Sequence, residues 1–418
     1  MIDLVILLIG LLVLRLCVFL ILERLNVRFL KLHGSNLPDS VQGIMDAPTF
    51  AKSVEYTEAK SKFSSLSTLY DGVILALIIV FGILPYAYGS LSDLFGYSLL
   101  GQSLVFIVTL FLFGLPNVPF TWWETFKLEE RFGFNKSTLK LWISDQIKGL
   151  ALGLIIGVPL LMGLMWIVTQ MGTYWWLWAF VFLWLFQVIM IVIYPMFILP
   201  LFNKLEPLEA GELKDRLMAL GDRCGFKSQT ILVMDGSKRS GHSNAFFTGF
   251  GQFRRIVLYD TLIEQMEIKE LEAVLAHEIG HYKCGHIPQR LFFSAFSTFL
   301  MFAFLGWLMQ TTWIFESLGF SGELSSPFVP AFLIVSLFSG LFTFWFSPFD
   351  SLWSRKHEYE ADAFAKNAMS EPDSLKNALR KLYKENLSNL LPHPLYSAFY
   401  YSHPTLVERE SALMKDGS

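Results

Sequence analysis

Residues 174–202 of the chain read YWWLWAFVFLWLFQVIMIVIYPMFILPLF, a stretch without a single charged side chain. An α-helix needs about 20 predominantly apolar residues to cross a hydrocarbon core about 30 Å thick. The stretch exceeds that length, and the Tyr and Trp residues at its start match the aromatic belt of a membrane interface. It therefore predicts a membrane-spanning helix.

Six further stretches have the same character, and they are about Ile2–Leu22, Leu69–Gly89, Tyr97–Val118, Gly149–Thr169, Pro288–Thr312 and Phe328–Pro348. The composition of all 418 residues agrees, because 53% are hydrophobic and 17% are charged, against about 25% charged residues in a soluble protein. A net charge of -3 and three cysteines indicate neither a nucleic-acid partner nor a disulfide framework. The sequence predicts a mainly α, multi-pass membrane protein and excludes an ordinary soluble enzyme.

The 33 Lys and Arg residues indicate how the spans are oriented. They occur in the segments 23–68, 119–148 and 203–287 and after Pro348, and they are absent from 90–96, 170–173 and 313–327. Because basic residues concentrate on the cytoplasmic side, we expect the N-terminus outside and the C-terminus in the cytosol. Arg15 lies within the first span, so it either faces a cavity or a partner carboxylate, or snorkels to the interface.

The spans divide the chain into four expected parts. Residues 1–202 hold five spans and a cytosolic amphipathic segment, 119–148, while 203–287 and 349–418 are two water-soluble blocks separated by the last two spans, 288–348. In the first block, Thr230–Met234 and Arg254–Asp260 predict the strands of a hairpin or short sheet. Apolar residues recur at helical spacing from Glu264 to about Pro288, so this part predicts a helix.

The motif His277-Glu278-Ile279-Gly280-His281 lies inside that predicted helix. Two histidines four residues apart project from one helix face, so both imidazoles can bind one metal ion. Glu278 between them can accept a proton from a water activated at the metal. Imidazole suits Zn²⁺, and a catalytic zinc site has three protein ligands and one open position.

The third ligand is expected in the helical segment that follows the seventh span. Glu358 is the candidate, and Asp362 lies one turn further on the same helix face. Asp362 would accept a hydrogen bond from the second ring nitrogen of a ligand histidine and so fix its tautomer. Taken alone, Glu358, Glu360 and Asp362 are more typical of a solvated charged face, but the incomplete histidine pair favours a metal site.

The place of this motif in the chain indicates the kind of substrate. His277 precedes the sixth span by about 11 residues, roughly 16 Å of helix, and Glu358 follows the seventh at a similar distance. The metal is therefore expected at the cytosolic membrane border. A membrane-tethered, lipidated or membrane-embedded polypeptide reaches that border more readily than a freely diffusing one.

Several further motifs resemble those of the integral-membrane zinc endopeptidases of the CAAX prenyl protease type, in peptidase family M48. The resemblance covers most of the chain and includes the seven-span layout, 132–138 (Phe-Gly-Phe-Asn-Lys-Ser-Thr), 200–204 (Pro-Leu-Phe-Asn-Lys), 240–246 (Ser-Gly-His-Ser-Asn-Ala-Phe), 277–281, 354–362 and 401–404 (Tyr-Ser-His-Pro). The His-Glu-x-x-His element is generic to many zinc peptidases. The other elements, in this order between these spans, are far more particular.

The resemblance implies a barrel of seven membrane helices around a chamber, capped by a gluzincin-like α+β catalytic domain made of 203–287 and 349–418. It implies one zinc ion per chain held by His277, His281 and Glu358, with Glu278 as the catalytic carboxylate. It implies that Asn244, Ala245 and Phe246 form an edge strand that binds the substrate backbone. It further implies that His403 and Arg409 line the site. On its own, His403 before a proline is more typical of a structural residue.

The sequence is compatible with two activities. The first is a zinc metalloendopeptidase that acts on membrane-associated or lipidated polypeptides, either in CAAX-type processing or in quality control of membrane proteins, with no need for an oligomer. His403 would then stabilise the oxyanion. The alternative is a multi-span transporter or metal carrier that uses the histidine pair as transit ligands, which leaves Glu278 without a role. The chain lacks a long insertion and an ER-retrieval tail, so a bacterial inner membrane is expected.

Overall fold

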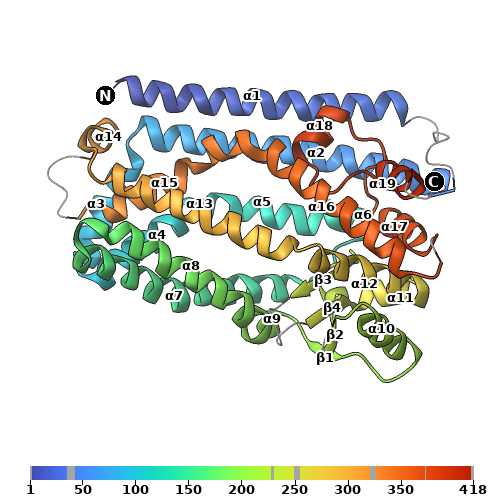
Figure 1. Cartoon of the computed structure of the whole chain (residues 1–418). Coiled ribbons are helices and arrows are strands. Elements are labelled where there is room, and N and C mark those ends of the chain that lie inside the picture. The colour runs from blue at the N-terminus through green and yellow to red at the C-terminus, as the bar shows by residue number, and fades with distance from the viewer. Residues whose placement is uncertain are drawn as a thin grey trace.

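The computed structural model describes residues 2–34, 43–226, 230–248, 255–320, 326–371 and 373–415. Long helices run side by side along one direction, and the strands gather at the end where the chain finishes (Figure 1). In the described part of the chain, seven helical runs are long and apolar enough to cross a membrane. The predicted fold class, a mainly helical seven-span protein with a small sheet, is confirmed.

The seven runs are built mainly from α1 (Ile2–His33), α2 (Ala47–Val80), α4 (Leu99–Gly114), α7 (Leu139–Gln170), α8 (Trp175–Ile193), α13 (His286–Leu308) and α15 (Phe328–Thr343). Further helices continue three of them: α5 (Val118–Trp123) and α6 (Glu130–Phe132) after α4, α9 (Leu199–Phe202) after α8, and α16 (Ser347–Ala368) after α15. The connections α3 (Ile83–Phe95) and α14 (Thr312–Ser317) lie at the end opposite the strands (Figure 1).

Several helices are longer than their apolar segments. The predicted span Leu69–Gly89 is divided, because α2 ends at Val80 and the rest belongs to α3. The amphipathic segment 119–148 is not a separate surface helix. It is shared between the helical run that ends at Phe132 and the start of α7. Hydropathy marks only the part of a helix that faces lipid, so the polar ends of α1 and α2 are not recognised by it.

The four strands are β1 (Leu205–Pro207), β2 (Thr230–Met234), β3 (Ala245–Thr248) and β4 (Arg255–Tyr259), in the order β1-β2-β4-β3. The short sheet was predicted correctly, but the two predicted strands do not form a hairpin. They are β2 and β4, which pair in parallel, whereas the antiparallel partner of β4 is β3. Parallel strands need a crossover connection, and the chain between β2 and β4 contains β3. This order leaves β3 at one edge of the sheet.

The remaining helices cover the sheet and bring the two polar blocks together. They are α10 (Glu212–Arg223), α11 (Asp260–Gln265), α12 (Ile268–Lys283), α17 (Asp373–Glu385), α18 (Pro394–Tyr400) and α19 (Leu406–Lys415). A buried apolar core, which includes Leu262, Leu275 and Leu379, joins residues of α11, α12 and α17. A separate core between the membrane helices includes Phe302 and Phe328.

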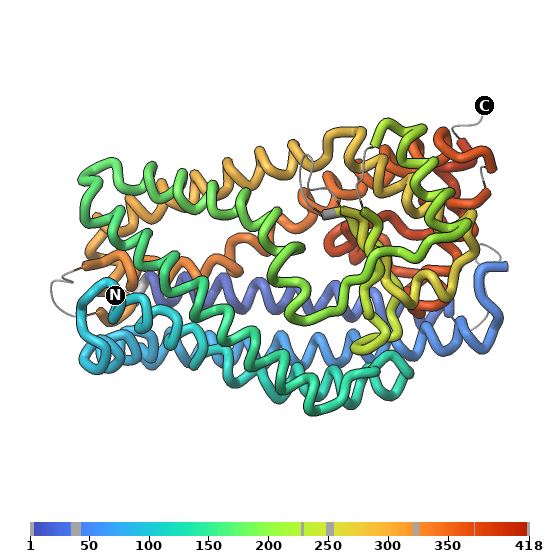
Figure 2. The backbone as a smooth tube through the Cα atoms, turned by 90° about the horizontal axis from the view of Figure 1, so that it is seen from below, coloured from blue at the N-terminus to red at the C-terminus, as the bar shows by residue number. Residues whose placement is uncertain are grey.

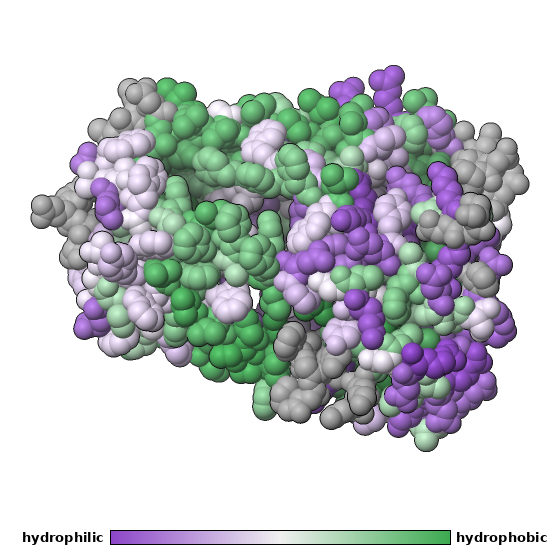
Figure 3. Space-filling view, in the orientation of Figure 1, coloured by the Kyte–Doolittle hydropathy of each residue, from purple (hydrophilic) through white to green (hydrophobic). Residues whose placement is uncertain are grey.

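The molecule is polarised along its length. The two ends of the chain lie at opposite ends of the molecule in both ribbon views, as an odd number of spans requires (Figures 1 and 2). On the face shown in Figure 3, hydrophobic surface predominates over the long helices, and hydrophilic surface gathers over the end with the strands, α10 and α11. This contrast matches an apolar belt in the membrane and a polar end in water.

Arg15 of α1 has a carboxylate within electrostatic range. Its guanidinium carbon lies 5.7 Å from the centre of the Phe344 ring, and Asp71 of α2 is near enough to interact with its charge. Asn117 is a hydrogen-bond partner of Asp71. Of the two expectations for Arg15, these contacts support the partner carboxylate rather than snorkelling.

Candidate metal centre

Three side chains converge between two helices, His277 and His281 from α12 and Glu358 from α16. The Nε2 atoms of the two histidines are 3.2 Å apart, and each lies 3.3 Å from a carboxylate oxygen of Glu358. Ligand atoms about 2.05 Å from a tetrahedral zinc ion lie about 3.3 Å from one another. The three side chains therefore already have the spacing that a zinc ion requires.

The charges around these atoms also fit a cation. Glu358 Oε2 is buried and has no hydrogen-bond partner among the residues that the structure describes. Neutral His277 and His281 would direct two nitrogen lone pairs at the same carboxylate, and such a set of buried acceptors needs a positive charge between them. Two imidazoles and one carboxylate are the donor set of a catalytic zinc site with an open fourth position.

Local sequence explains how α12 delivers its ligands. The helix starts with a reciprocal capping box, in which the side chains of Glu267 and Glu270 each accept a hydrogen bond from the backbone of the other residue. Leu271, Leu275 and Ile279 are almost fully buried and hold one face of α12 in the core. The ligand face is thereby fixed toward α16.

Asp362 and Arg409 support His277 from behind. Asp362 Oδ1 lies 2.9 Å from His277 Nδ1 and can accept its hydrogen, which leaves Nε2 free for a metal. Arg409 of α19 in turn donates two hydrogen bonds to the Asp362 carboxylate, from Nε and Nη2. Burial alone lowers the pKa of His277, but its contacts with Asp362 and Glu358 raise it overall to about 9. The site thus attracts a positive charge, as a proton or as a metal.

Glu278 is half-buried beside the two ligand histidines. Burial raises the pKa of its carboxyl group above the usual value, while the neighbouring His277 and His281 act in the opposite direction. A carboxylate with a raised pKa is a better proton acceptor at neutral pH than an exposed one. Its position is compatible with the proton-transfer role that the motif predicts.

His403 approaches the ligands from the loop between α18 and α19. Its Nε2 lies 3.5 Å from Glu358 Oε1, and its Nδ1 is 3.0 Å from the hydroxyl of Ser402. Partial desolvation by the surrounding protein lowers the pKa of His403, although 60% of its side chain is exposed, and the nearby Glu358 only partly offsets this. His403 is therefore neutral at pH 7. With Ser402 donating to Nδ1, its Nε2–H can donate toward the site.

The residues expected to bind the substrate backbone lie at the edge of the sheet. Ala245 and Phe246 belong to β3, which pairs with β4 on one side only. Asn244 is exposed, and its carbonyl oxygen accepts a hydrogen bond from Tyr259 N, so the pairing with β4 begins there. An edge strand of this kind offers unpaired backbone groups to a peptide.

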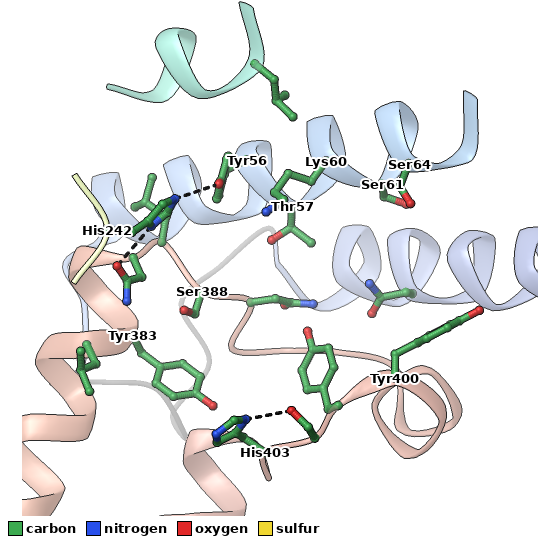
Figure 4. Close-up of a pocket in the computed structure, with 18 of the residues that line it drawn as sticks. Tyr56, Thr57, Lys60, Ser61, Ser64, His242, Tyr383, Ser388, Tyr400 and His403 are labelled. Atoms are coloured by element: carbon green, nitrogen blue, oxygen red, sulfur yellow. Dashed lines mark hydrogen bonds between the residues drawn. The ribbon is translucent and has the colours of Figure 1, made fainter. Parts of the chain in front are cut away.

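A cavity of about 1090 Å³ adjoins the centre. His403, Arg409 and Asn244 line one part of it. Another part is lined by Thr57, Lys60, Ser61, Ser64, Ser67 and Thr68, which follow one face of α2. Figure 4 shows Tyr383 and His403 across this space from Lys60 and Ser61. Polar side chains thus line both sides of the cavity, although it reaches between helices that cross the membrane.

A hydrogen-bonded group in the cavity wall was not foreseen from the sequence. Tyr56 donates to Glu129 (2.8 Å), and Glu129 also contacts His242 Nε2 (3.3 Å), whose ring stacks on Phe134. These contacts join α2, the third span and the loop before β3. Figure 4 shows the contact between Tyr56 of α2 and His242 of the loop. They explain why the motifs at 132–138 and 240–246 occur together.

Asn386, the residue directly after α17, holds the next residue of this loop. Its Oδ1 accepts from Ser243 N (3.1 Å), and its Nδ2 donates to Ser243 O (3.3 Å), so it binds the backbone as a neighbouring strand would. The loop that leads into Asn244 is therefore fixed from two sides. No spacing in the sequence indicates this contact, because Asn386 and Ser243 are far apart in the chain.

Comparison with known proteins identifies two families in succession. Residues 26–204 match the family described as CAAX prenyl protease N-terminal, five membrane helices, and residues 207–416 match peptidase family M48. CAAX prenyl protease 1 of Saccharomyces cerevisiae is 39% identical over 413 residues, which cover 92% of this chain and 90% of that protein. The CAAX prenyl protease 1 homolog of Homo sapiens is 34% identical over 430 residues, with coverage of 91% and 89%.

Similarity extends to a solved structure. A crystal structure of S. mikatae Ste24p superposes with a TM-score of 0.91 and 36% sequence identity, covering 98% of both chains. The expected bacterial inner membrane is not supported, because the relatives compared here are from yeasts, plants, animals and a slime mould. The expectation of a bacterial membrane relied on the lack of an insertion and of a retrieval tail, and neither feature determines the kind of organism.

Proposed function

The chain belongs to the CAAX prenyl protease 1 family of peptidase family M48, integral-membrane zinc metallopeptidases, and we propose that it hydrolyses a peptide bond near the C-terminus of prenylated polypeptides. The observation that carries this proposal is the convergence of His277, His281 and Glu358 beside a polar cavity that continues along α2. A substrate held in the membrane by a lipid can reach the centre through such a cavity without leaving the bilayer.

In this proposal His277, His281 and Glu358 hold one zinc ion per chain. When bound, zinc supplies a Lewis acid that polarises the scissile carbonyl group and makes water a better nucleophile. Glu278 accepts a proton from the attacking water and passes it to the leaving amine. Burial raises the pKa of Glu278 above its usual value, which favours its role as the proton acceptor.

Other residues orient the substrate. Neutral His403 donates from Nε2 toward the oxygen on which negative charge develops. Asn244, Ala245 and Phe246 pair with the substrate backbone at the free edge of β3. Arg409 is better assigned to support than to substrate contact, because its side chain is only 6% exposed and both of its hydrogen bonds to Asp362 are inside the protein.

We place the catalytic end in the cytosol. The Lys and Arg distribution supports this orientation, and the prenylated ends of cytosolic proteins are presented on that side. Residues 203–287 and 349–418 act as one catalytic unit in this proposal, since α12 from the first block and α16, which runs into the second, share the ligands. On the membrane side, the cavity is lined by residues of α1, α2 and the third span.

The proposal is tested with the purified full-length protein in lipid vesicles. A farnesylated peptide that ends in a CAAX sequence should be cut to release a C-terminal peptide, and the unprenylated peptide should be cut poorly. Metal analysis should give about one zinc per chain. Glu278→Gln should retain zinc and lose cleavage.

The same experiment examines the transporter alternative. Movement of zinc into vesicles, together with no cleavage of any prenylated peptide, would favour a carrier over a peptidase. Equal cleavage of prenylated and unprenylated peptides would instead remove the lipid from the recognised substrate and leave membrane protein quality control as the task.

A further inference from the structure

His286, the first residue of α13, lies between His281 and Glu360. Its Nδ1 is 2.9 Å from His281 Nδ1, and its Nε2 is 2.9 Å from Glu360 Oε2. The side chain is only 2% exposed. None of the sequence patterns that identified the metal ligands includes His286, and the reaction proposed above does not use it.

The chain turns back on itself to make this contact. α12 ends at Lys283, and Gly285 adopts the left-handed conformation with φ of +74°, so α13 starts in a new direction. Glycine adopts this conformation readily, whereas it is strained for residues with a Cβ atom. Through this turn, an imidazole five residues after His281 comes to face it.

The positions of the hydrogens on His281 and His286 follow from their hydrogen-bond partners. A neutral His281 that offers Nε2 to a metal must carry its hydrogen on Nδ1, so His286 Nδ1 has to accept it. The hydrogen of His286 is then on Nε2, where Glu360 accepts it. In this arrangement each of the four atoms has one partner: His281 Nδ1 donates to His286 Nδ1, and His286 Nε2 donates to Glu360 Oε2. No other arrangement of the two neutral imidazoles satisfies all four atoms.

A stacked ring holds His286 in this plane. His357 lies parallel to it, with ring centres 4.0 Å apart and an interplanar angle of 11°. His357 is fixed in turn by the hydrogen bond between its Nε2 and Gln289 Oε1 (3.0 Å) and by the edge of Trp353. The imidazole of His286 therefore has little freedom to rotate away from His281 and Glu360.

We propose that His286 and Glu360 are positioning residues that orient His281 for zinc, as Asp362 orients His277. The inference rests on the metal site proposed above. Helix α16 then supplies three carboxylates with different tasks: Glu358 binds the metal, Asp362 supports one histidine directly, and Glu360 supports the other through His286. The two histidines of the motif are thus fixed independently.

The two supports differ in their surroundings. Asp362 is 2% exposed and paired with Arg409, whereas Glu360 is 40% exposed and has Lys356 at 3.7 Å. The imidazole of His286 lies between the two residues, so the carboxylate of Glu360 can orient the ligand His281 without touching it. Outer partners of metal ligands typically change metal affinity by about 10–100-fold when they are removed.

The test measures zinc affinity of the full-length protein in detergent, by competition with a chelator, and the visible absorption of the Co²⁺-loaded form. His286→Leu should lower zinc affinity about 10–100-fold and change the Co²⁺ spectrum, because His281 loses its acceptor. His286→Gln offers an amide oxygen to His281 and an amide hydrogen to Glu360, and should recover part of the loss. Glu360→Ala should lower affinity about tenfold.

Two matched controls separate this effect from general damage. His33→Leu removes a histidine from the last turn of α1, and Glu371→Ala removes an exposed glutamate that pairs with Lys269. Both should keep the wild-type zinc affinity and spectrum. Wild-type affinity and an unchanged spectrum in His286→Leu would overturn the inference.

The remaining outcomes are also decisive. If His286→Leu does not fold, Glu360→Ala decides, since its side chain is partly exposed and wild-type affinity in that variant would count against the inference. If the wild-type protein itself binds no zinc, the metal site fails, and that result is distinguishable from a failure of His286 alone.

Discussion

A Cβ atom on Gly280 would lie only 2.9 Å from the carbonyl oxygen of Ala361, so glycine alone permits the approach between α12 and α16. The neighbouring contacts are equally close, 3.0 Å to Ala361 Cα and 3.2 Å to Phe364 Cβ. Gly280 is part of the His277–His281 motif, and Ala361 lies between Glu358 and Asp362. Gly280, which allows the two helices to approach, therefore also sets the distance between the histidines of α12 and Glu358 of α16.

Gly280→Ala should reduce activity far more than stability. The added methyl group meets backbone atoms that cannot rotate away, so the helices must separate, at a cost of about 1–3 kcal/mol. A displacement near 1 Å at the ligands lowers activity about 100-fold. Cleavage of a prenylated peptide and thermal unfolding in detergent measure the two effects.

Gly153→Ala in α7 is the matched control, because nothing lies within 4 Å of a Cβ at Gly153. This substitution should leave activity unchanged and stabilise the helix slightly, since alanine is the better helix former. If Gly280→Ala were as active as Gly153→Ala, the close approach of α12 and α16 would not determine the geometry of the site.

Glu278→Gln should retain zinc and lose about 10²–10⁴-fold in kcat, the usual effect of removing a general acid–base group. Glutamine keeps the shape of the side chain, and Glu278 is not among the converging ligands. Metal analysis and single-turnover cleavage provide the two readings. Loss of zinc together with activity would show that Glu278 is needed for the site rather than for proton transfer.

The parts of this protein that could be predicted from sequence are those set by local periodicity. The pair His277 and His281 depends only on helical spacing, and the spans only on runs of apolar residues. The pairing of β2 with β4 could not be predicted in the same way, because β-pairing is decided by contacts that are distant in sequence.

Contacts made through turns were missed for a related reason. His286 reaches His281 only because Gly285 reverses the chain, and nothing in the sequence shows the direction of the next helix. Asn386 and Ser243 meet across more than a hundred positions. Gly285, two residues after the end of α12 and directly before His286, is a local signal for a turn but not for its direction.

Asn386→Ala should weaken substrate binding more than the chemical step. The substitution removes both hydrogen bonds to the Ser243 backbone, so the loop into Asn244 and β3 loses one of its two anchors. We expect KM to rise several-fold and kcat to change little. The stability should fall by about 1–2 kcal/mol, as for two lost hydrogen bonds.

Thr138→Ala is a suitable comparison, since Thr138 accepts a hydrogen bond from Leu141 N at the start of α7 and is not among the residues that line the cavity. A similar loss of stability with an unchanged KM is expected there. An unchanged KM in Asn386→Ala as well would contradict a role of the loop in holding the substrate.

Zinc binding should release protons at neutral pH. In the metal-free protein Asp362 and Glu358 raise the pKa of His277 to about 9, above its value near 6.5 in the unfolded chain. His277 is then protonated at pH 7, and its proton must leave before Nε2 can bind a metal. Calorimetry in two buffers with different ionisation enthalpies should find that zinc binding releases the His277 proton at pH 7, and that this contribution decreases as the pH rises through about 9.

The same protonation makes the stability of the metal-free protein depend on pH. A raised histidine pKa stabilises the fold fully below about pH 6.5, and this contribution disappears as the pH rises through about 9. The unfolding temperature of the metal-free protein should therefore fall over that range, whereas the zinc-loaded protein should not show this fall. In Asp362→Asn the release at pH 7 should drop, because His277 loses the carboxylate that contributes most to its raised pKa. Equal proton release in the wild type and in Asp362→Asn would show that the proton comes from another group.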